Sequence, residues 1–364
     1  MVAMASPPGR AMVRDEYWPE RLAKEERPLT QVGTRNQTML SPQAESPMPT
    51  QGATSQAVLH ALTVDVEDYF HVSAFRHVVS FRQWPSMESR VERNTHILLE
   101  LLAEFGVRAT FFALGCVAES FPSLIRSICD AGHELGCHSY AHRLVYDLTP
   151  AEFRADTQRA MVALEDAAGR AVRLYRAPSF SITNRSAWAL EVLLELGFTH
   201  DSSIFPMRHD LYGFSGVPRF PFAVQKGLRR LVEFPPPTFQ LGTFTLPITG
   251  GGYLRLLPLW WQTNRLRALA RQGYPTLLYL HPWELDFDQP RLPAPWRSRF
   301  RHYTGLRRTG LRLRRLLSEF RFGTLSQVLD CRPPSATLEL SELTQTGTTA
   351  STLPTPCCSL ERCQ

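Results

Sequence analysis

The sequence predicts an α/β fold built on parallel strands, and two observations lead to it. Apolar segments of strand length alternate with amphipathic helical segments between about Val58 and Asp330. Such alternation favours parallel strands joined by right-handed crossovers. The chain has 364 residues, 43% of them hydrophobic, which is enough for a large core. Polar clusters follow the predicted strands, and in a β/α barrel the carboxyl ends of the strands form the active face.

Local signals mark where individual elements begin and end. Thr149-Pro150-Ala151-Glu152 is a capping box with proline at the first helical position, so a helix begins there. Pro85-Ser86 and Gly106 bound an earlier helix. Strands are predicted at residues 58–66, 107–114, 133–137, 172–175, 198–201 and 275–280. Helices are predicted at residues 88–105, 122–131, 150–167 and 184–196, and a late helix includes residues 265–271.

The two ends of the chain differ in composition from this body. Residues 1–57 and 331–364 are rich in Pro, Ser and Thr with little periodicity, and we expect both to be disordered. The first segment holds no apolar core of signal-peptide length, because charged residues interrupt it throughout. No run approaches the roughly 18 apolar residues that span a bilayer. We therefore expect a cytoplasmic chain with no transmembrane segment.

Charge and cysteine content narrow the class of protein further. The net charge is +6 and nearly all of the basic residues are arginine. No nucleic-acid motif accompanies this charge, so we expect no nucleic-acid partner. The seven cysteines form no C-x-x-C pair and no readable disulfide framework, which favours a reducing compartment. We interpret an arginine-rich stretch at residues 297–321 as the solvated face of a helix.

A histidine pair and a carboxylate cluster indicate a metal site. His138 and His142 follow a predicted strand and can face one point if the backbone takes a helical turn between them. The first strand ends in Asp65-Val66-Glu67-Asp68. Two imidazole nitrogens and one carboxylate oxygen leave a divalent metal, zinc first, with an open position for water, as in catalytic sites.

Three further strand ends carry polar residues: Arg176, Asp201 and His281. Amide hydrolysis needs an activated water, a Lewis acid for the tetrahedral oxyanion, a base and an acid. The strand ends supply residue types that suit each of these roles.

At these positions the sequence resembles the polysaccharide deacetylase superfamily, the NodB-homology domain of carbohydrate esterase family four. More narrowly, it resembles the branch found in bacterial exopolysaccharide gene clusters, whose first motif reads T-x-D-V-E-D-Y-F and here spans Thr63–Phe70. The segments at residues 250–255 and 300–303 look like the C-terminal extension of that branch. The resemblance implies a distorted (β/α) barrel over residues 58–330, with the extension starting at about residue 205.

The resemblance also implies a metal-dependent removal of N-acetyl groups from amino sugars. Asp65 matches the general base that takes a proton from the metal-activated water, and Arg176 matches the arginine that orients this base. His138 and His142 match the two histidine ligands of the metal.

The acid of the reaction is implied in the same way. His281 matches the general acid that protonates the leaving amine. Asp201 matches the carboxylate that tunes this histidine.

The third metal ligand is open, because the commonest family pattern has two adjacent aspartates and this sequence does not. Glu67 is the ligand if the spacing is D-x-D, since residues i and i+2 share a strand face. Asp68 is the ligand if the strand bulges or ends at Val66. A third possibility has Glu67 as the base and Asp68 as the ligand.

We therefore expect a hydrolase that removes N-acetyl groups from acetamido sugars of a bacterial exopolysaccharide or its precursor. Its substrate would be an N-acetylated polysaccharide or oligosaccharide, and its metal zinc, with cobalt or nickel as alternatives. Two other functions stay open: hydrolysis of a small cyclic amide or ureide on the same fold, and glycan binding without catalysis. The sequence predicts neither the sugar, nor the linkage, nor the oligomeric state.

Overall fold

The computed structural model describes residues 58–209, 212–242 and 244–345. Residues 1–57, for which disorder was predicted, lie outside these ranges.

The strands are β1 (Leu59–Val66), β2 (Thr110–Ala113), β3 (Glu134–Cys137), β4 (Leu174–Tyr175), β5 (His200–Asp201), β6 (Phe222–Lys226), β7 (Arg229–Glu233), β8 (Thr238–Leu241), β9 (Phe244–Pro247), β10 (Leu277–Leu280), β11 (Arg321–Gly323) and β12 (Ala336–Glu339). The helices are α1 (Val91–Glu104), α2 (Gly115–Ser120), α3 (Pro122–Asp130), α4 (Pro150–Ala168), α5 (Trp188–Glu195), α6 (Gly251–Leu256), α7 (Leu259–Arg271), α8 (Trp296–Tyr303), α9 (Leu306–Glu319), α10 (Leu325–Cys331) and α11 (Leu340–Gln345).

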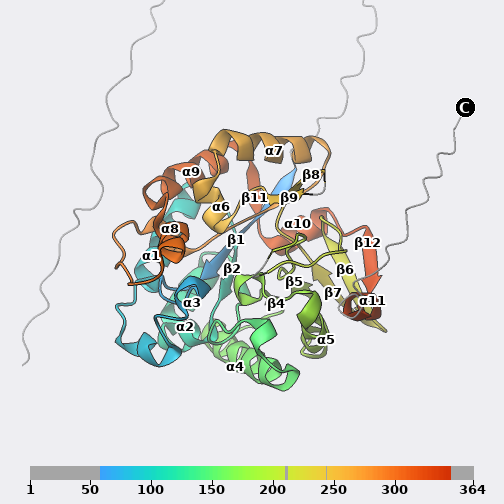
Figure 1. Cartoon of the computed structure of the whole chain (residues 1–364), viewed down its shortest axis with the longest axis horizontal. Helices are drawn as coiled ribbons and strands as arrows, with labels where there is room; N and C mark the ends of the chain where they lie inside the picture. The colour runs from blue at the N-terminus through green and yellow to red at the C-terminus, as the bar shows by residue number, and fades with distance from the viewer. Residues whose placement is uncertain (1–57, 210–211, 243, 346–364) are drawn as a thin grey trace, which may run out of the picture. The chain divides into compact units, whose positions relative to one another are not determined.

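A mainly parallel sheet forms the centre of the fold, and helices surround it (Figure 1). Its strands are hydrogen-bonded in the order β10-β1-β2-β3-β4-β5-β7-β6-β12, and β11 pairs with the start of β1. The β6–β7 hairpin is antiparallel, whereas β1 is parallel to both β2 and β10. The predicted α/β class with parallel strands is confirmed.

Side chains of β1 alternate between two cores. Leu62, Val64 and Val66 lie in the larger core, beneath the outer helices. Ala61 lies in a smaller core on the opposite face of the sheet. Because successive side chains of a strand point to opposite faces, Asp65 lies on the face of Ala61. The alternation thus carries the first predicted site residue to the inner face, at the carboxyl end of the strand.

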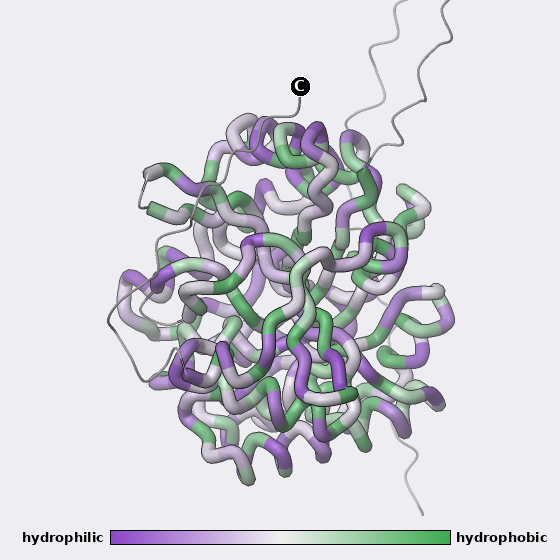
Figure 2. The backbone as a smooth tube through the Cα atoms, turned by 90° about the vertical axis from the view of Figure 1, so that its right-hand side faces the viewer, coloured by the Kyte–Doolittle hydropathy of each residue, from purple (hydrophilic) through white to green (hydrophobic). Residues whose placement is uncertain are grey.

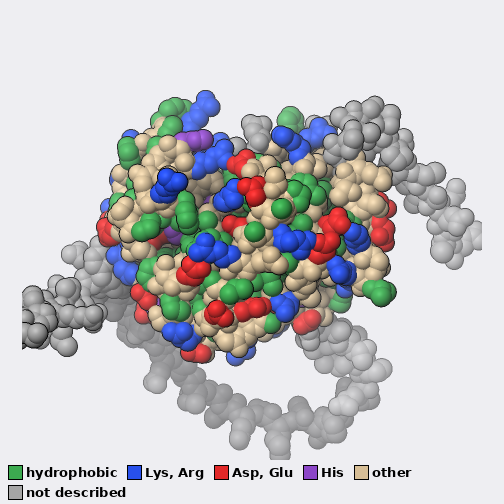
Figure 3. All heavy atoms as spheres, turned by 90° about the horizontal axis from the view of Figure 1, so that it is seen from below, with side chains coloured by type: hydrophobic (Ala, Val, Ile, Leu, Met, Phe, Trp, Pro, Cys, Tyr) green, Lys and Arg blue, Asp and Glu red, His purple; other side chains and the backbone are tan. Residues whose placement is uncertain are grey.

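The outer helices are amphipathic and lie against the larger core. Along the tube of Figure 2 their residues alternate between hydrophilic and hydrophobic. In α9, Leu313, Leu316 and Leu317 are buried, as the expected apolar side of the arginine-rich helix requires. Acidic and basic side chains are interspersed over the face drawn in Figure 3. Within the described ranges no helix is both long and apolar enough to cross a membrane.

The folded region continues beyond its predicted end at Asp330. β12 pairs in parallel with β6, and α11 buries Leu340 and Leu343. The expected disorder of residues 331–364 is therefore wrong for residues 336–345, and residues 346–364 lie outside the described ranges. These two elements could not be predicted from periodicity, because β12 and α11 span only 4 and 6 residues and their composition is polar.

Candidate active site

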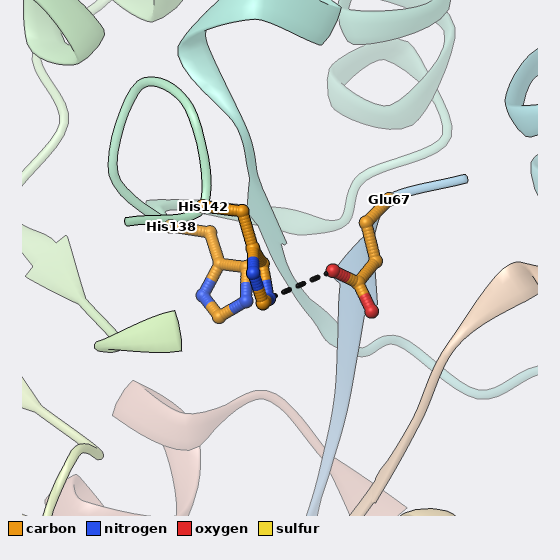
Figure 4. Close-up of side chains that lie close together, drawn as sticks. All are labelled: Glu67, His138 and His142. Carbon is orange, nitrogen blue, oxygen red and sulfur yellow. Dashed lines mark ion pairs between the residues drawn. The ribbon is translucent and has the colours of Figure 1, made fainter. Parts of the chain in front are cut away.

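Three buried donors meet at the carboxyl end of the sheet: Glu67, His138 and His142. Their ligand atoms all lie within 4.8 Å of one another. Oε2 of Glu67 is 2.9 Å from Nε2 of His142. In Figure 4 both imidazole rings are turned toward the Glu67 carboxylate. The structure thus brings together the two predicted histidines and one of the two candidate carboxylates.

The loop after β3 turns the two histidines toward each other, but not by the helical turn that the spacing suggested. Ser139 and His142 have φ angles of 67° and 52°, in the left-handed region. Residues other than glycine rarely adopt this conformation, and when they do they cluster at functional sites. The expectation that His138 and His142 face one point is confirmed, but the helical turn from which it was argued is not present.

The protonation states of this cluster suit a cation. Nδ1 of His138 lies 2.8 Å from the carbonyl oxygen of Arg176, which can only accept, so this nitrogen carries the proton and Nε2 keeps its lone pair. Burial lowers the pKa of His138 to about 4, so the ring is neutral near pH 7. Burial alone would raise the pKa of Glu67, but His142, His281 and His138 together hold it well below its usual range. Neutral imidazoles and an ionised carboxylate are the forms that bind metal.

One atom of the cluster also lacks a partner. Oε2 of Glu67 is buried and accepts no well-directed hydrogen bond from the described residues, despite its short distance to His142. A buried carboxylate oxygen without a donor is costly unless a cation or a solvent molecule satisfies it. The residues present therefore fit a divalent metal, with Glu67, His138 and His142 as the donors.

Asp68 has a different position, although β1 ends at Val66, the case in which Asp68 was expected to be the ligand. Its Oδ2 accepts hydrogen bonds from Oγ of Ser89 at 2.7 Å and from the backbone N–H groups of Arg90 and Val91 at 2.8 and 3.1 Å. Its Oδ1 accepts one from the N–H of Tyr69 at 3.0 Å. Asp68 therefore fixes the start of α1 and points away from the face that carries Asp65 and Glu67.

These positions predict opposite effects for the two carboxylates. Glu67→Ala should remove most of the bound metal, because it deletes one of three donors. Asp68→Ala should keep the metal but lower the free energy of unfolding by about 1–3 kcal/mol, because buried N–H groups lose their acceptor. Metal content by atomic emission and urea unfolding measure the two effects. Loss of metal from Asp68→Ala with retention in Glu67→Ala would reverse the assignment.

Asp65 lies beside the cluster and is held by a buried arginine. Nη1 of Arg176 donates to Oδ1 of Asp65 at 2.7 Å and to Oγ1 of Thr63 at 2.8 Å, and the Arg176 side chain is fully buried. Its Nη2 and Nε donate to Oγ and the carbonyl oxygen of Ser202. Every contact fixes the guanidinium, which in turn fixes one oxygen of Asp65. The predicted relation between these two residues is present.

His281 completes the group from the other side of β1. Its Nε2 lies 3.4 Å from Oε1 of Glu67 and 3.8 Å from Oδ2 of Asp65. Its Nδ1 lies 2.7 Å from Oε1 of Glu284, and Oε2 of Glu284 accepts from Nε of Arg255 at 2.6 Å. Burial would lower the pKa of His281, but the hydrogen bond to Glu284 and the charges of Glu67, Glu284 and Asp65 raise it to about 9. His281 is therefore protonated at neutral pH and oriented by Glu284.

The expectation that Asp201 serves this histidine is corrected by these contacts. Asp201 accepts a hydrogen bond from Oγ of Ser203 and lies next to Glu233 across the β5–β7 pair, and both carboxyl groups are fully buried. The carboxylate that reaches His281 is Glu284, which the sequence reasoning did not single out. A local signal for it exists: in His281-Pro282-Trp283-Glu284, Glu284 bonds back to the backbone N–H of His281 at 3.1 Å, as in a capping box.

The Asp201–Glu233 pair predicts a pH-dependent stability. Two carboxyl groups hydrogen bond only if one is protonated, and burial raises the pKa of Asp201 to about 6 and that of Glu233 well above its usual range. Both pKa values are higher in the folded than in the unfolded chain, so the pair stabilises the fold at low pH. That stability is lost as pH rises from about 4 through the folded-state pKa values, by about 1.4 kcal/mol per pH unit for each proton.

Glu233→Gln should make this loss shallower, since the amide donates to Asp201 without a proton that can be released. Urea unfolding at about pH 5 and pH 8 compares the variant with wild type. Glu195→Gln on the surface is the matched control and should keep the wild-type slope. An equal slope in all three proteins would contradict the shared proton.

A cavity of about 580 Å³ opens over these residues, within the range of small-molecule sites. Its floor includes Asp65, Glu67 and His281, and its wall includes Tyr212 and Tyr253, whose hydroxyl groups hydrogen bond to each other. The glycines just before Tyr253 let the backbone of this wall pass close to the ring of Tyr279. A Cβ on Gly250 would come within 2.2 Å of the Tyr279 ring, so only glycine fits.

Comparison with protein families divides the chain into two matched regions. Residues 80–200 match the family described as Polysaccharide deacetylase, and residues 202–330 match a Domain of unknown function, DUF3473. The chain therefore carries a domain of the polysaccharide deacetylase family of hydrolases, followed by a DUF3473 domain.

Curated relatives align with a part of the chain. A peptidoglycan-N-acetylglucosamine deacetylase from Bacillus cereus is 35% identical over 95 residues, which are 26% of this chain and 34% of that protein. A peptidoglycan deacetylase from Helicobacter pylori is 32% identical over 107 residues, 29% of this chain and 36% of that protein. A chitooligosaccharide deacetylase from Azorhizobium caulinodans is 33% identical over 100 residues, 27% of this chain and 45% of that protein. The chain thus spans between about a third and a half of the length of these relatives.

One solved structure resembles most of the chain. It is a putative polysaccharide deacetylase from Mycobacterium smegmatis, 21% identical, with a TM-score of 0.53, and the match covers 85% of this chain and 98% of that one. At this identity the match supports the fold.

The site draws on both matched regions and on residues before them. His138, His142 and Arg176 lie in the first region, and Arg255, His281 and Glu284 lie in the second. Asp65 and Glu67 precede both. The DUF3473 domain therefore contributes side chains to the same cavity as the deacetylase domain.

Proposed function

We propose that this protein is a metal-dependent N-deacetylase of acetamido sugars. The observation that carries the proposal is that a carboxylate held by Arg176, a histidine held by Glu284 and a cluster of three possible metal donors line one cavity. Asp65 lies within 3.8 Å of His281, and His281 lies within 3.4 Å of Glu67. An arrangement of base, acid and Lewis-acid site is what hydrolysis of an amide requires.

The residues divide the proton transfers between them. Asp65 is the proposed base, because Arg176 holds one of its oxygens and leaves the other free, 3.8 Å from Nε2 of His281 in the same cavity. His281 is the proposed acid, because Glu284 fixes Nδ1 and leaves the Nε2 proton for the leaving nitrogen. A divalent cation on Glu67, His138 and His142 supplies a Lewis acid that activates water and stabilises the developing oxyanion. Zinc is the first candidate for these donors, with cobalt and nickel next.

The relatives support an acetamido sugar as the substrate. Their names include an N-acetylglucosamine unit of peptidoglycan and a chitooligosaccharide. The motif Thr63–Phe70 favours a bacterial exopolysaccharide or its precursor, and we keep this as the proposed natural substrate. A cytoplasmic site of action is part of the same proposal.

Acetate release from a panel of acetamido-sugar oligomers tests the activity. The full chain is stripped with a chelator and resupplied with zinc, cobalt or nickel. His138→Ala/His142→Ala is the matched inactive control. Metal-dependent acetate release by wild type alone supports the proposal. Turnover of small cyclic amides only, or glycan binding with no turnover under any metal, would overturn it.

A further inference from the structure

A second cavity, of about 600 Å³, lies beside the catalytic one and is lined by arginine. It is bounded by the end of α6, by α8 and by the start of α9, and it shares Arg255 and Leu256 with the catalytic cavity. Among its described lining residues there is no aspartate or glutamate. Its arginines are Arg255, Arg291, Arg307, Arg308 and Arg312.

Contacts with uncharged groups hold several of these side chains in place. Nη1 of Arg312 donates to the carbonyl oxygen of Leu257 at 2.8 Å. The Arg291 guanidinium lies 4.3 Å from the centre of the Tyr303 ring, and that of Arg307 lies 4.6 Å from the centre of the Phe287 ring.

Four of the five arginines have no carboxylate partner within the described part of the chain. Arg255 pairs with Glu284, and no ion pair involves Arg291, Arg307, Arg308 or Arg312.

Other arginines of the same helix behave differently. Arg314 pairs with Glu104 at 2.5 Å, and Arg315 pairs with Glu319 at 3.6 Å. The α9 arginines around the cavity lie in the first two turns of the helix. Arg314 and Arg315 lie seven residues beyond Arg307 and Arg308, on the same faces of the helix, but there they reach carboxylates. The two groups of arginines provide a matched comparison on one helix.

The start of α9 adds positive potential to the cavity. The helix begins after Gly305, whose φ is 82°, without a side-chain cap and without an acidic residue in its first turn. Arg307 and Arg308 occupy that turn, although cations are unfavourable at the positive end of the helix dipole. Arg308 and Arg312 form a like-charge i, i+4 pair, which is destabilising by about 0.2–0.5 kcal/mol in an isolated helix. Burial and the charge of Arg308 lower the pKa of Arg312.

We propose that this cavity binds a phosphoryl group. Four guanidinium groups without carboxylate partners among the described residues carry more positive charge than one carboxylate would neutralise, and the uncapped start of α9 adds to it. A phosphate monoester carries a charge of about −1.5 to −2 at pH 7. Arginine forks and helix N-termini are the common protein partners of phosphate. The cavity volume leaves room for the group to which the phosphate is attached.

Binding of inorganic phosphate and pyrophosphate tests the site directly. The chain carries His138→Ala/His142→Ala and is treated with a chelator, so that no phosphate binds at a metal. Calorimetric titration is done against chloride at equal ionic strength. We expect one saturable site, and Arg308→Glu should weaken binding by about tenfold or more, the loss of one charge-assisted contact. Arg314→Glu, with the same change in net charge, should bind as the parent does.

Two outcomes would overturn the proposal: no saturable binding beyond chloride, or equal weakening by Arg308→Glu and Arg314→Glu. Because Arg308 is exposed, its replacement should leave the fold intact, and circular dichroism checks this. Arg308→Gln is the milder second variant and should give an intermediate affinity. Since binding is measured without turnover, this result stands apart from that of the deacetylase assay.

A second experiment asks whether the phosphoryl group belongs to the substrate or to free phosphate, and it rests on the proposed function. Acetate release is compared on acetamido-sugar oligomers with and without a phosphate substituent. If the group belongs to the substrate, Arg308→Glu lowers kcat/KM by about tenfold for the phosphorylated oligomer alone. If the ligand is free phosphate, Arg308→Glu leaves kcat/KM equal for the two oligomers. It abolishes only the change in acetate release that added inorganic phosphate causes in wild type. Either result supports the site.

Discussion

Replacing Asp65 with asparagine should reduce acetate release by about 10²–10⁴-fold while the protein keeps its metal. The amide cannot act as a base at the position of Oδ2, the oxygen that Arg176 leaves free. Because Asp65 is not among the three clustered donors, the metal should remain. Steady-state kinetics and metal content of the same preparation measure both effects.

The control for this substitution is Asp166→Asn, which changes an exposed carboxylate and should keep full activity. Loss of metal from Asp65→Asn would contradict the assignment, because it would mean that Asp65 is a ligand. The frame with Glu67 as the base would then have to be considered again.

Replacing Glu284 with glutamine should lower kcat by about 10–100-fold, with KM and metal content nearly unchanged. Glu284 touches Nδ1 of His281 and Nε of Arg255; Glu284 and Arg255 are buried, and His281 is partly exposed. The amide keeps the shape of the side chain but not its charge, so His281 loses the partner that raises its pKa. The expected change therefore falls on proton donation rather than on substrate binding.

Asp201→Asn is the informative comparison for Glu284→Gln. Asp201 accepts from Ser203 and lies next to Glu233, so its replacement should change stability and leave kcat within about twofold of wild type. A large loss of kcat in Asp201→Asn with little effect in Glu284→Gln would restore the role that the sequence resemblance implied for Asp201.

Strand periodicity explains why most of the site could be predicted. Polar residues after a buried strand lie at its carboxyl end, and parallel strands bring those ends together. Periodicity alone did not decide between Glu67 and Asp68, because β1 ends at Val66, where Asp68 was expected to be the ligand, and Glu67 nevertheless joins the histidines. The choice depended on the groups that hold Asp68 elsewhere, the Ser89 hydroxyl and the backbone N–H groups of Arg90 and Val91, which no local pattern shows.

The parts that could not be predicted depend on contacts between distant segments. Arg255 reaches Glu284 because α6 packs beside the residues after β10, and no local pattern links positions 29 apart. The strands between residues 222 and 247 are short and form hairpins, and they were not predicted. The left-handed residues Ser139 and His142 replace the helical turn expected there. In each case tertiary packing decided a conformation that local propensity leaves open.

Zinc titration of the chelator-treated chain, followed by acetate release, tests the central claim most directly. The account predicts that activity rises linearly and reaches its plateau at about one zinc ion per chain, because Glu67, His138 and His142 form one site. The His138→Ala/His142→Ala chain should show no rise over the same range. Full activity in the chelated protein, or an equal rise in the double variant, would contradict the account.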